Sequence, residues 1–513
     1  MSLILGPNGK PYPHRARRSR SLRASFDAAQ TNTENENHWA NADALSADRA
    51  ASKTVRVTLR KRSRYEVANN SYARGMVNFL ANDCIGSRVR LQFTATDQNK
   101  SIKRVDRRAV LLSRDEASFI EGEFFAWAQE CNLFDLLRTL RAARCVDGES
   151  FGILTVNPRL SSPVQLGVRD IEADHVTSGD AFRADSATYL DGIRYDQYGN
   201  PIIYEVLKDH PGDYYRFTDE YEPIPARNVF HLYTRERPGQ RRGIPELTSA
   251  LPLFAMLRRW TLASVAAAET AADLAAILFV RDGLAAEAAD SETPFDTIPI
   301  ERRVMMTLPE GWDMKQFDPK QPISTYKEVK REILGEVCRC VGLPVHLALN
   351  DSSEHNYSSA RLDNQGYVKT RRVDRVRMES QSLNVIWSAW LAEALLIDGY
   401  LPQRVRSTYT DWSHTWMFDG DEHVDPLKEA GALKLRLDSF AETLGDYWAS
   451  RGADWEEKIE QIAKEREKME SLGLTVSDVS VAMKEDPETG EATWVFDRDP
   501  AGRLAGVRAS KDQ

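Results

Sequence analysis

The pattern of apolar residues changes near residue 150, and this change most constrains the fold. Between Ser52 and Arg138, apolar side chains such as Val77 and Leu80 recur at helical spacing. Short runs rich in β-branched and aromatic residues, separated by turn residues, then follow at 152–156, 165–169, 192–195, 202–207 and 228–233. This order predicts an α+β chain in which helical parts flank a mostly antiparallel sheet.

Two helical zones border the β-prone stretch. The segment 119–138 is predicted as one helix, with Phe124, Phe125, Trp127, Phe134 and Leu137 as core candidates. The segment 246–280 is predicted as a long helix that is dense in alanine in its second half. Because small side chains let helices approach closely, this zone suits packing between repeated subunits, although a single-chain helix fits equally well.

A second helical region follows a proline-rich, irregular stretch. Thr325-x-x-Glu328 predicts a capping box that begins a helix, and Gly342-Leu-Pro344 predicts its end. A polar loop at 350–356 leads into a long helix from Ser359 to about Leu396. We expect the basic residues of this helix at outward-facing positions; these are Arg361, Lys369, Arg371, Arg372, Arg375 and Arg377.

The remainder of the chain is predicted to hold one strand and two helices. The strand is expected at 404–416, and the helices at 427–437 and 454–472. Beyond Leu474 the sequence is polar and charged with little periodicity, so we expect disorder there.

Charge and cysteine usage narrow the class of protein. The formal net charge of −9 disfavours a protein that coats DNA with a basic surface, but it suits a duct along which DNA slides. The five cysteines lack paired CxxC spacing, so we expect neither a disulfide framework nor a metal site. The most apolar helix carries Glu269 and Asp273 at mid-span, which disfavours a membrane helix, and no signal peptide is visible. We therefore expect a reducing cytoplasm and no cofactor.

No constellation of residues predicts an enzyme. The sequence holds no P-loop, GxGxxG, HExxH or GxSxG motif, and a packaging ATPase would need the first of these. Asp411 and His414 would face opposite sides of a strand. Ser353, Glu354 and His355 lie together in a loop without a placed base or oxyanion donor. A hydrolase or nuclease using His355 or His414 stays as the alternative, and a structural adaptor of a cellular helical assembly is a third reading.

Several segments occur in the order seen in one known family. They are Leu59-Arg-Lys-Arg-Ser-Arg-Tyr-Glu66 with Asn69-Asn-Ser-Tyr-Ala-Arg-Gly75 and Asn82-Asp-Cys-Ile-Gly86, then 190–196 with 199–204, 224–233 with 237–245, Gly342-Leu-Pro344 with Asn356-Tyr-Ser-Ser-Ala-Arg361, and 424–430. No single segment is specific, but the shared order is. From about Arg15 to Leu474 the chain resembles the lambda-type family of tailed-bacteriophage portal proteins.

The resemblance implies a mixed portal architecture for a ring-forming subunit. Such a subunit has a wing of helices plus mostly antiparallel sheet, a helical stem, a small α/β clip and a helical crown. Segment order assigns a mobile polar and basic arm to 1–51, wing to 52–245 and 362–424, stem to 246–280 and 324–345, clip to 281–323, channel loop to 346–361, crown to 425–474 and a disordered tail to 475–513.

The resemblance also implies partners. We expect a ring of about twelve copies at a capsid vertex of the virion, assembled in the host cytoplasm, with double-stranded DNA passing through without sequence-specific binding. Expected protein partners are the terminase large subunit, the major capsid and scaffold proteins, and the head–tail connector. No membrane partner is expected.

Three sets of site residues follow from this assignment. Ala267, Ala271 and Ala275 are expected to pack between subunits in the stem. Phe295, Ile298, Ile300 and Trp312 are expected to form a partner surface on the clip. The loop expected to touch DNA consists of Asn350, Asp351, Ser352, Ser353, Glu354, His355, Asn356, Tyr357 and Ser358.

The loop chemistry suits brief contact with a moving duplex. Asn, Ser and His side chains can hydrogen-bond phosphate oxygens without the salt-dependent grip of Lys and Arg, while Asp351 and Glu354 would repel the duplex. The alternative is an ordinary surface loop that caps the next helix through Ser358 or Ser359.

Overall fold

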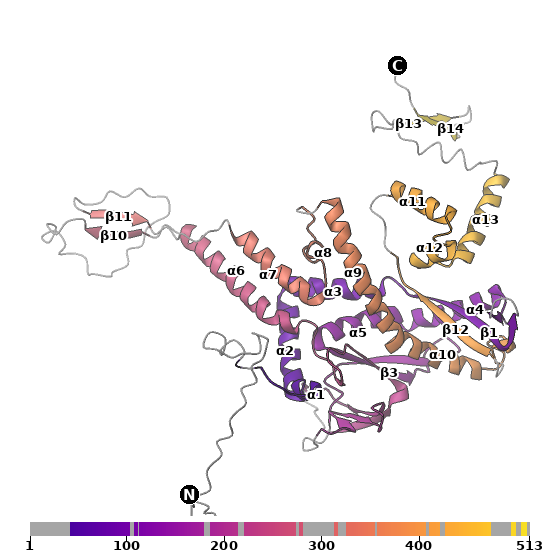
Figure 1. The fold of residues 1–513 in the computed structure, drawn as a ribbon, viewed down its shortest axis with the longest axis horizontal. Helices are drawn as coiled ribbons and strands as arrows, with labels where there is room; N and C mark the ends of the chain where they lie inside the picture. Colours follow the sequence, from indigo (N-terminus) through magenta and orange to yellow (C-terminus); the bar gives the residue numbers. More distant parts are fainter. Residues whose placement is uncertain are drawn as a thin grey trace, which may run out of the picture. The chain divides into compact units, whose positions relative to one another are not determined.

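The computed structural model describes most of the chain between residue 40 and residue 472, together with two strands near the C-terminus. The described residues are 40, 42–102, 107–110, 112–178, 185–213, 220–272, 276–280, 312–316, 325–353, 356–406, 410–420, 426–472, 494–498 and 504–509. The chain divides into two units, residues 1–50 and residues 51–513. Within the described part of the first unit lies the short helix α1 (Ala47–Ala50), and all other elements belong to the second (Figure 1).

Four helices begin the second unit. They are α2 (Lys53–Asn69), α3 (Ser71–Ile85), α4 (Arg114–Glu130) and α5 (Leu133–Asp147). The side chain of Asn70 separates the first two, because it accepts the backbone N–H groups of Tyr72 and Ala73 and so caps α3. The prediction of one helix over 119–138 is wrong. The chain turns at Asn132, which has φ 50°, and the apolar periodicity runs across this break without revealing it.

Five predicted strand segments are confirmed, but they form two antiparallel sheets. In the three-stranded sheet, β3 (Glu149–Val156) lies between β4 (Leu166–Ile171) and β9 (Val229–Tyr233). The four-stranded sheet has the order β5 (Tyr189–Leu190), β6 (Ile193–Tyr195), β7 (Pro201–Leu207) and β8 (Tyr221–Pro225). Apolar alternation predicts strands but carries no information on which sheet each strand joins.

A third sheet joins segments that lie far apart in the sequence. The long strand β1 (Arg90–Ile102) pairs antiparallel with both β2 (Arg107–Val110) and β12 (Thr410–Met417), and Phe93 lies opposite His414. The predicted strand at 404–416 begins later than expected, because residues Gln403–Arg406 form a 3-10 turn. This sheet ties the second predicted wing segment to the first.

The alanine-rich zone is shorter than predicted. Helix α6 covers Leu251–Ala272, and residues Ala276–Val280 form strand β10, which pairs antiparallel with β11 (Trp312–Gln316). The prediction of helix up to residue 280 is therefore wrong. The run Ile277-Leu-Phe-Val280 has high β-propensity, and its partner strand lies more than thirty positions later in the sequence.

Helix α7 (Tyr326–Val341) lies alongside α6 (Figure 1). The predicted capping box is absent, because the Thr325 side chain makes no cap hydrogen bond. The predicted end is confirmed. Gly342 has φ 69°, a left-handed conformation that glycine adopts without steric cost, and its N–H bonds back to the last turn of the helix.

The chain continues through helices that follow the predicted order. They are α8 (Val345–Leu349), α9 (Tyr357–Met378), a π turn at Glu379–Leu383, α10 (Asn384–Leu396), α11 (Pro426–Asp438), α12 (Leu444–Ser450) and α13 (Trp455–Ser471). Within the tail predicted to be disordered, β13 (Trp494–Arg498) and β14 (Leu504–Ala509) form an antiparallel pair. The prediction of disorder is wrong for these two segments.

Three apolar clusters hold the second unit together. An aromatic core gathers the predicted Phe124 and Trp127 of α4 with Trp387 and Trp390 of α10, and the latter two rings stack at a centroid distance of 5.4 Å. A helical core packs side chains of α3, α6 and α7 together, and a sheet core gathers side chains of the three-stranded and the four-stranded sheets. The five cysteines are free thiols. Among the residues that the structure describes, no helix is both long and apolar enough to cross a membrane.

Candidate functional site

The predicted channel loop is short, because both of its ends are helical. Residues Val345–Leu349 form α8 and Tyr357 already belongs to α9, so the prediction of loop over 346–361 is wrong at both ends. Pro344 precedes α8 with extended backbone. Asn350, with φ 50°, ends α8 in the left-handed conformation that asparagine tolerates better than most residues.

The base of the loop is anchored in the protein. His346 of α8 is buried, and its Nε2 lies 3.1 Å from Oδ1 of Asn364 on α9. Leu343 is buried in the helical core, and Leu347 packs against that core from its edge. The loop therefore projects from a fixed platform, as the prediction of a loop held between two helices requires.

The first half of the loop folds around Asp351. Its backbone N–H donates to the carbonyl of His346 at 3.1 Å, and its Oδ1 accepts the N–H of Ser353 at 3.0 Å. Hydrogen bonds from Ser353 lower the pKa of Asp351, and the positive charges of Lys327 and Arg331 on α7 act in the same direction. The start of the loop therefore carries a negative charge at neutral pH.

The second half of the loop ends in a helix cap. Asn356 accepts the backbone N–H of Ser359 through Oδ1 at 2.9 Å, and the Ser359 hydroxyl donates to the Asn356 carbonyl at 3.1 Å. The capping role exists, but Asn356 performs it and the prediction of Ser358 or Ser359 is wrong. Asn350 and Ser352 are exposed, whereas Glu354 and His355 lie outside the described residues, as do the side chains of Tyr357 and Ser358.

Helix α9, which carries the loop, is fixed to α3 by polar contacts. Arg371 donates to Oδ1 of Asp83 at 2.8 Å, and the Tyr367 hydroxyl donates to Oδ2 of the same carboxylate at 2.6 Å. Arg375 donates to the backbone carbonyls of Asp83 and Cys84 at 2.9 and 3.1 Å. Arg371 is buried and Arg375 half-buried, so the prediction that these two lie on the outer face is wrong.

A buried ion network joins α9 to α5 and to the segment that leads into α6. Arg141 Nε donates to Asp374 Oδ2 at 2.7 Å and Arg144 Nε to Glu246 Oε1 at 3.1 Å, while Arg144 also pairs with Asp374 and Arg141 with Glu246. Burial alone would raise the pKa of Asp374, yet the guanidinium groups of Arg141 and Arg144 hold it well below its ordinary value. The network connects the helix that follows the loop to the start of the predicted stem.

The predicted stem residues are only partly described. Ala267 lies in α6 and is half-buried, whereas Met256, Leu262 and Val265 of the same helix are exposed. Ala271 is the penultimate residue of α6, but its side chain lies outside the described part, as does the whole of Ala275.

The predicted clip surface is also only partly described. Trp312 is the first residue of β11 and lies opposite Val280 of β10, and its side chain lies outside the described part. Phe295, Ile298 and Ile300 fall outside the described residues altogether.

His414, one of the two histidines considered for a hydrolase or nuclease, is hydrogen-bonded to the side chain of Asn384. His414 Nε2 lies 2.9 Å from Oδ1 of Asn384, and Trp416 Nε1 donates to the same oxygen at 2.7 Å. An amide oxygen accepts hydrogen bonds, so this His414 nitrogen carries the proton and is not free to act as a base. His355, the other candidate, lies outside the described residues.

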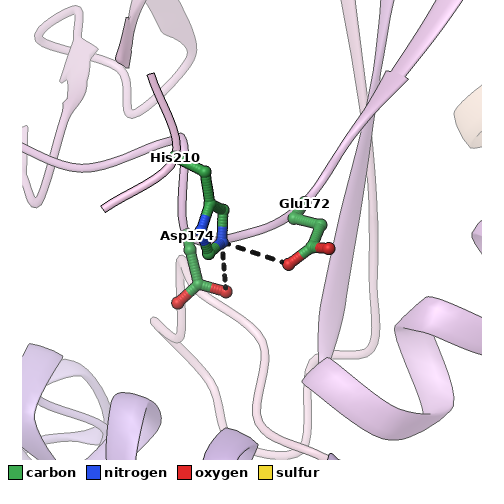
Figure 2. Close-up of side chains that lie close together, drawn as sticks. All are labelled: Glu172, Asp174 and His210. Atoms are coloured by element: carbon green, nitrogen blue, oxygen red, sulfur yellow. Dashed lines mark ion pairs between the residues drawn. The ribbon is translucent and has the colours of Figure 1, made fainter. Parts of the chain in front are cut away.

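Sequence reasoning missed a cluster of two carboxylates and a histidine (Figure 2). His210 Nε2 lies 3.2 Å from Oε2 of Glu172 and 3.9 Å from Oδ2 of Asp174. Arg64 Nη2 already lies 3.0 and 2.7 Å from these same two oxygens. The Gly212 N–H donates to His210 Nδ1 at 3.0 Å, which places the proton of a neutral ring on Nε2.

This geometry favours ion pairing over metal binding at the cluster. A metal bound to Nε2 of His210 would require the proton to move to Nδ1, which would break the hydrogen bond from Gly212. It would also have to displace Arg64 from both carboxylates. The residues therefore do not fit a metal ion. The cluster could not be found from sequence, since Arg64 and His210 are far apart and only the fold brings them together.

Comparison with known proteins identifies relatives over most of the chain. The family model for phage portal proteins of the lambda family matches residues 33–375. A probable portal protein of Halomonas phage phiHAP-1 is 24% identical over 500 residues, which cover 92% of each chain. Among solved structures, one similar chain comes from the neck of a native GTA particle computed with C12 symmetry. It is 13% identical with a TM-score of 0.43, and the match covers 78% of this chain and 93% of that chain. A chain from the neck of an empty GTA particle computed with C6 symmetry is 14% identical, with the same TM-score and coverage.

Proposed function

Because the chain belongs to the lambda family of phage portal proteins, we propose that it forms a closed ring of about twelve copies at one capsid vertex. Double-stranded DNA passes through this ring during packaging and ejection. The match of the family model over residues 33–375 carries the proposal, because it includes the predicted stem, the clip and the loop at 350–358. The ring works within the virion and is assembled in the host cytoplasm.

The proposed partners follow from the predicted regions. The terminase large subunit, and later the head–tail connector, dock on the clip at 281–323, and the scaffold and major capsid proteins surround the ring. DNA is bound transiently and without sequence preference, in keeping with the net charge of −9. The role is structural, and His414 bound to the Asn384 amide gives no support to the enzymatic alternative.

We assign the DNA contact to the loop at 350–358, in which Ser352 is exposed. The anchoring of its base through His346 and Leu343 supports this assignment, because a loop that contacts a moving duplex must keep its position while the DNA passes. The negative charge of Asp351 limits adhesion to phosphate groups. Asn356 serves mainly to cap α9.

The loop assignment predicts separate effects for DNA contact and for capping. Replacing Ser352 and His355 together by alanine should leave ring assembly intact and lower the length of DNA retained in filled heads, because hydrogen-bonding groups that touch phosphate oxygens are lost. Asn356→Ala should instead destabilise the start of α9 by about 1 kcal/mol, and Asn356→Ser should restore most of that loss.

Two measurements separate these effects. Gel electrophoresis of nuclease-protected DNA gives the packaged length, and electron microscopy of the same particles gives ring assembly. Normal packaged length and normal retention in the Ser352→Ala, His355→Ala variant would contradict the DNA contact and leave the loop with the capping role alone.

A further inference from the structure

Helix α9 presents a seam of three apolar residues, a glycine and a lysine on the side that faces away from the protein. Its members follow one another at spacings of four, three, four and three residues; they are Leu362, Gly366, Lys369, Val373 and Val376. The side chains of Leu362, Val373 and Val376 are 70%, 60% and 59% exposed. This spacing is that of a helix that packs along another helix. We refer to these five residues as the α9 outer face.

Positive charge accompanies this apolar face. Lys369 belongs to it, and Arg361 and Arg372 lie along its margin; all three residues are exposed. None of the three forms an ion pair within the described part of the chain. The face therefore suits a partner helix that covers these apolar side chains and carries negative charge.

Helix α7 presents the complementary charge. Glu328, Glu332 and Glu336 lie four residues apart and are exposed, and we refer to them as the α7 acidic face. They lie on the opposite side of the helix from Leu334 and Val337, which are buried in the helical core. No ion pair involves any of the three carboxylates among the residues with described placement.

A glycine that the single chain does not require lies in the α9 outer face, and another lies beside the α7 acidic face. A Cβ atom added at Gly366 would meet nothing within 4 Å, and one added at Gly335, on the margin of the α7 acidic face, would meet only Val345 Cγ2 at 4.0 Å. Glycine in a helix interior is less favourable than alanine. Close approach of a helix from a second copy would explain why glycine stands at both positions, which packing within one chain does not explain.

We propose that, between neighbouring copies of this chain, the α7 acidic face of one packs against the α9 outer face of the next. This proposal rests on the ring proposed above and names the surfaces that meet in it. The two faces differ, so the contact is head-to-tail, the kind that closes a ring by repeated rotation. Leu334 of α7 and Tyr367 of α9 lie in the same helical core, so one packed core carries both faces and each copy can add the same rotation.

A second copy of the chain fits the two faces better than DNA does. A phosphate backbone would match Arg361, Lys369 and Arg372 but would leave Leu362, Val373 and Val376 exposed to water. It would also leave the α7 acidic face without a partner. Covering Leu362, Val373 and Val376 with the neighbouring helix removes apolar surface from water and so supplies affinity, while the charges select the register and the partner.

Charge reversal on each face tests the proposal. One variant carries Glu332→Lys and Glu336→Lys, and the other carries Arg361→Glu and Arg372→Glu. Each variant alone places like charges in every interface, so the concentration for half-assembly, measured by mass photometry, should rise by at least about tenfold. A reversal of two exposed wing residues, Arg159→Glu with Arg169→Glu, serves as the matched control and should assemble like the wild type.

Mixing the two variants provides the decisive arm. In an equimolar mixture the two variants can alternate around the ring. Each reversed α7 face then meets a reversed α9 face, and each native α7 face meets a native α9 face, so opposite charges meet in every interface and rings should form again. Recovery also shows that both variants are folded.

Failure of the mixture to assemble, or normal assembly of either variant alone, would overturn the proposed contact. Intact rings with reduced DNA retention in the arginine variant would assign the basic residues to DNA and would likewise overturn it. Assembly of the wild-type protein tests ring formation itself. Absence of rings in the wild type would therefore contradict the proposed function, whereas the variants test only this interface.

Discussion

Replacing Glu149 by alanine is expected to destabilise the folded chain by at least about 3–5 kcal/mol, because it leaves buried positive charge without compensation. Glu149, at the start of β3, is fully buried. Arg242 Nη2 donates to its Oε1 at 2.7 Å and Arg242 Nε to its Oε2 at 2.8 Å. Arg60 and His231 also hydrogen-bond this carboxylate, at 3.4 and 3.1 Å.

The chain offers a matched control for this variant. Glu220 pairs with Lys208 at 2.8 Å, but both side chains are exposed, so Glu220→Ala should leave the free energy of unfolding almost unchanged. Denaturant titration followed by circular dichroism measures both midpoints. A Glu149→Ala midpoint within error of that for Glu220→Ala would contradict the structural role assigned to the buried carboxylate.

Replacing Asp374 by alanine is expected to have a similarly large effect, about 3–5 kcal/mol, because Arg141 and Arg144 lose a shared buried partner. Asp135→Ala is the matched control. That carboxylate pairs with Arg138 on the same helix face at 3.1 Å and is 77% exposed, so its loss should cost about 0–1 kcal/mol. Equal denaturation midpoints for the two variants would contradict the coupling of α9 to α5.

The pKa shifts predict how the Asp374 effect depends on pH. The folded protein holds the pKa of both Asp374 and Glu246 below their ordinary values. Their contribution to stability is therefore fully present above the pH at which unfolded carboxyl groups titrate, near about 4, and is lost as pH falls through and below that range. The stability difference between wild type and Asp374→Asn should shrink on acidification. A difference that stays constant down to about pH 3 would exclude the carboxylate charge as its source.

Sequence patterns predicted the parts of this fold that rest on local chemistry. The strands β3, β4, β6, β7 and β9 follow from short runs of β-branched and aromatic residues, and Gly342 marks the end of α7 as expected. The aromatic core was also predicted in part, through Phe124 and Trp127. In each case the signal lies within a few residues of the element that it describes.

The patterns failed where the inward face of a helix is polar. Tyr367, Arg371 and Asp374 of α9 face the protein, whereas Leu362 and Val373 face away from it. Helical periodicity places apolar residues on the buried face, so for α9 it exchanges the buried and the exposed face. The reason lies in Asp83, Arg141 and Arg144, which other segments supply and only the fold brings near.

The candidate loop was predicted in its position but not in its detail. Its polar composition and the flanking end signals gave its place between α7 and α9. The short helix α8 was missed because Val345–Leu349 is too brief to show a period. The Asn356 cap was missed because Asn356, Ser358 and Ser359 are all competent caps. The cluster of Glu172, Asp174 and His210 has no sequence signal at all.

The central claim is that this chain forms the closed ring of a phage portal. Negative-stain electron microscopy of the purified full-length protein at micromolar concentration tests it most directly, with mass photometry of the same sample. We predict closed rings of uniform size, close to twelve copies, with a central opening wide enough to admit a DNA duplex. Stable monomers or dimers, or open helical filaments of the kind a cellular adaptor would form, would contradict the claim.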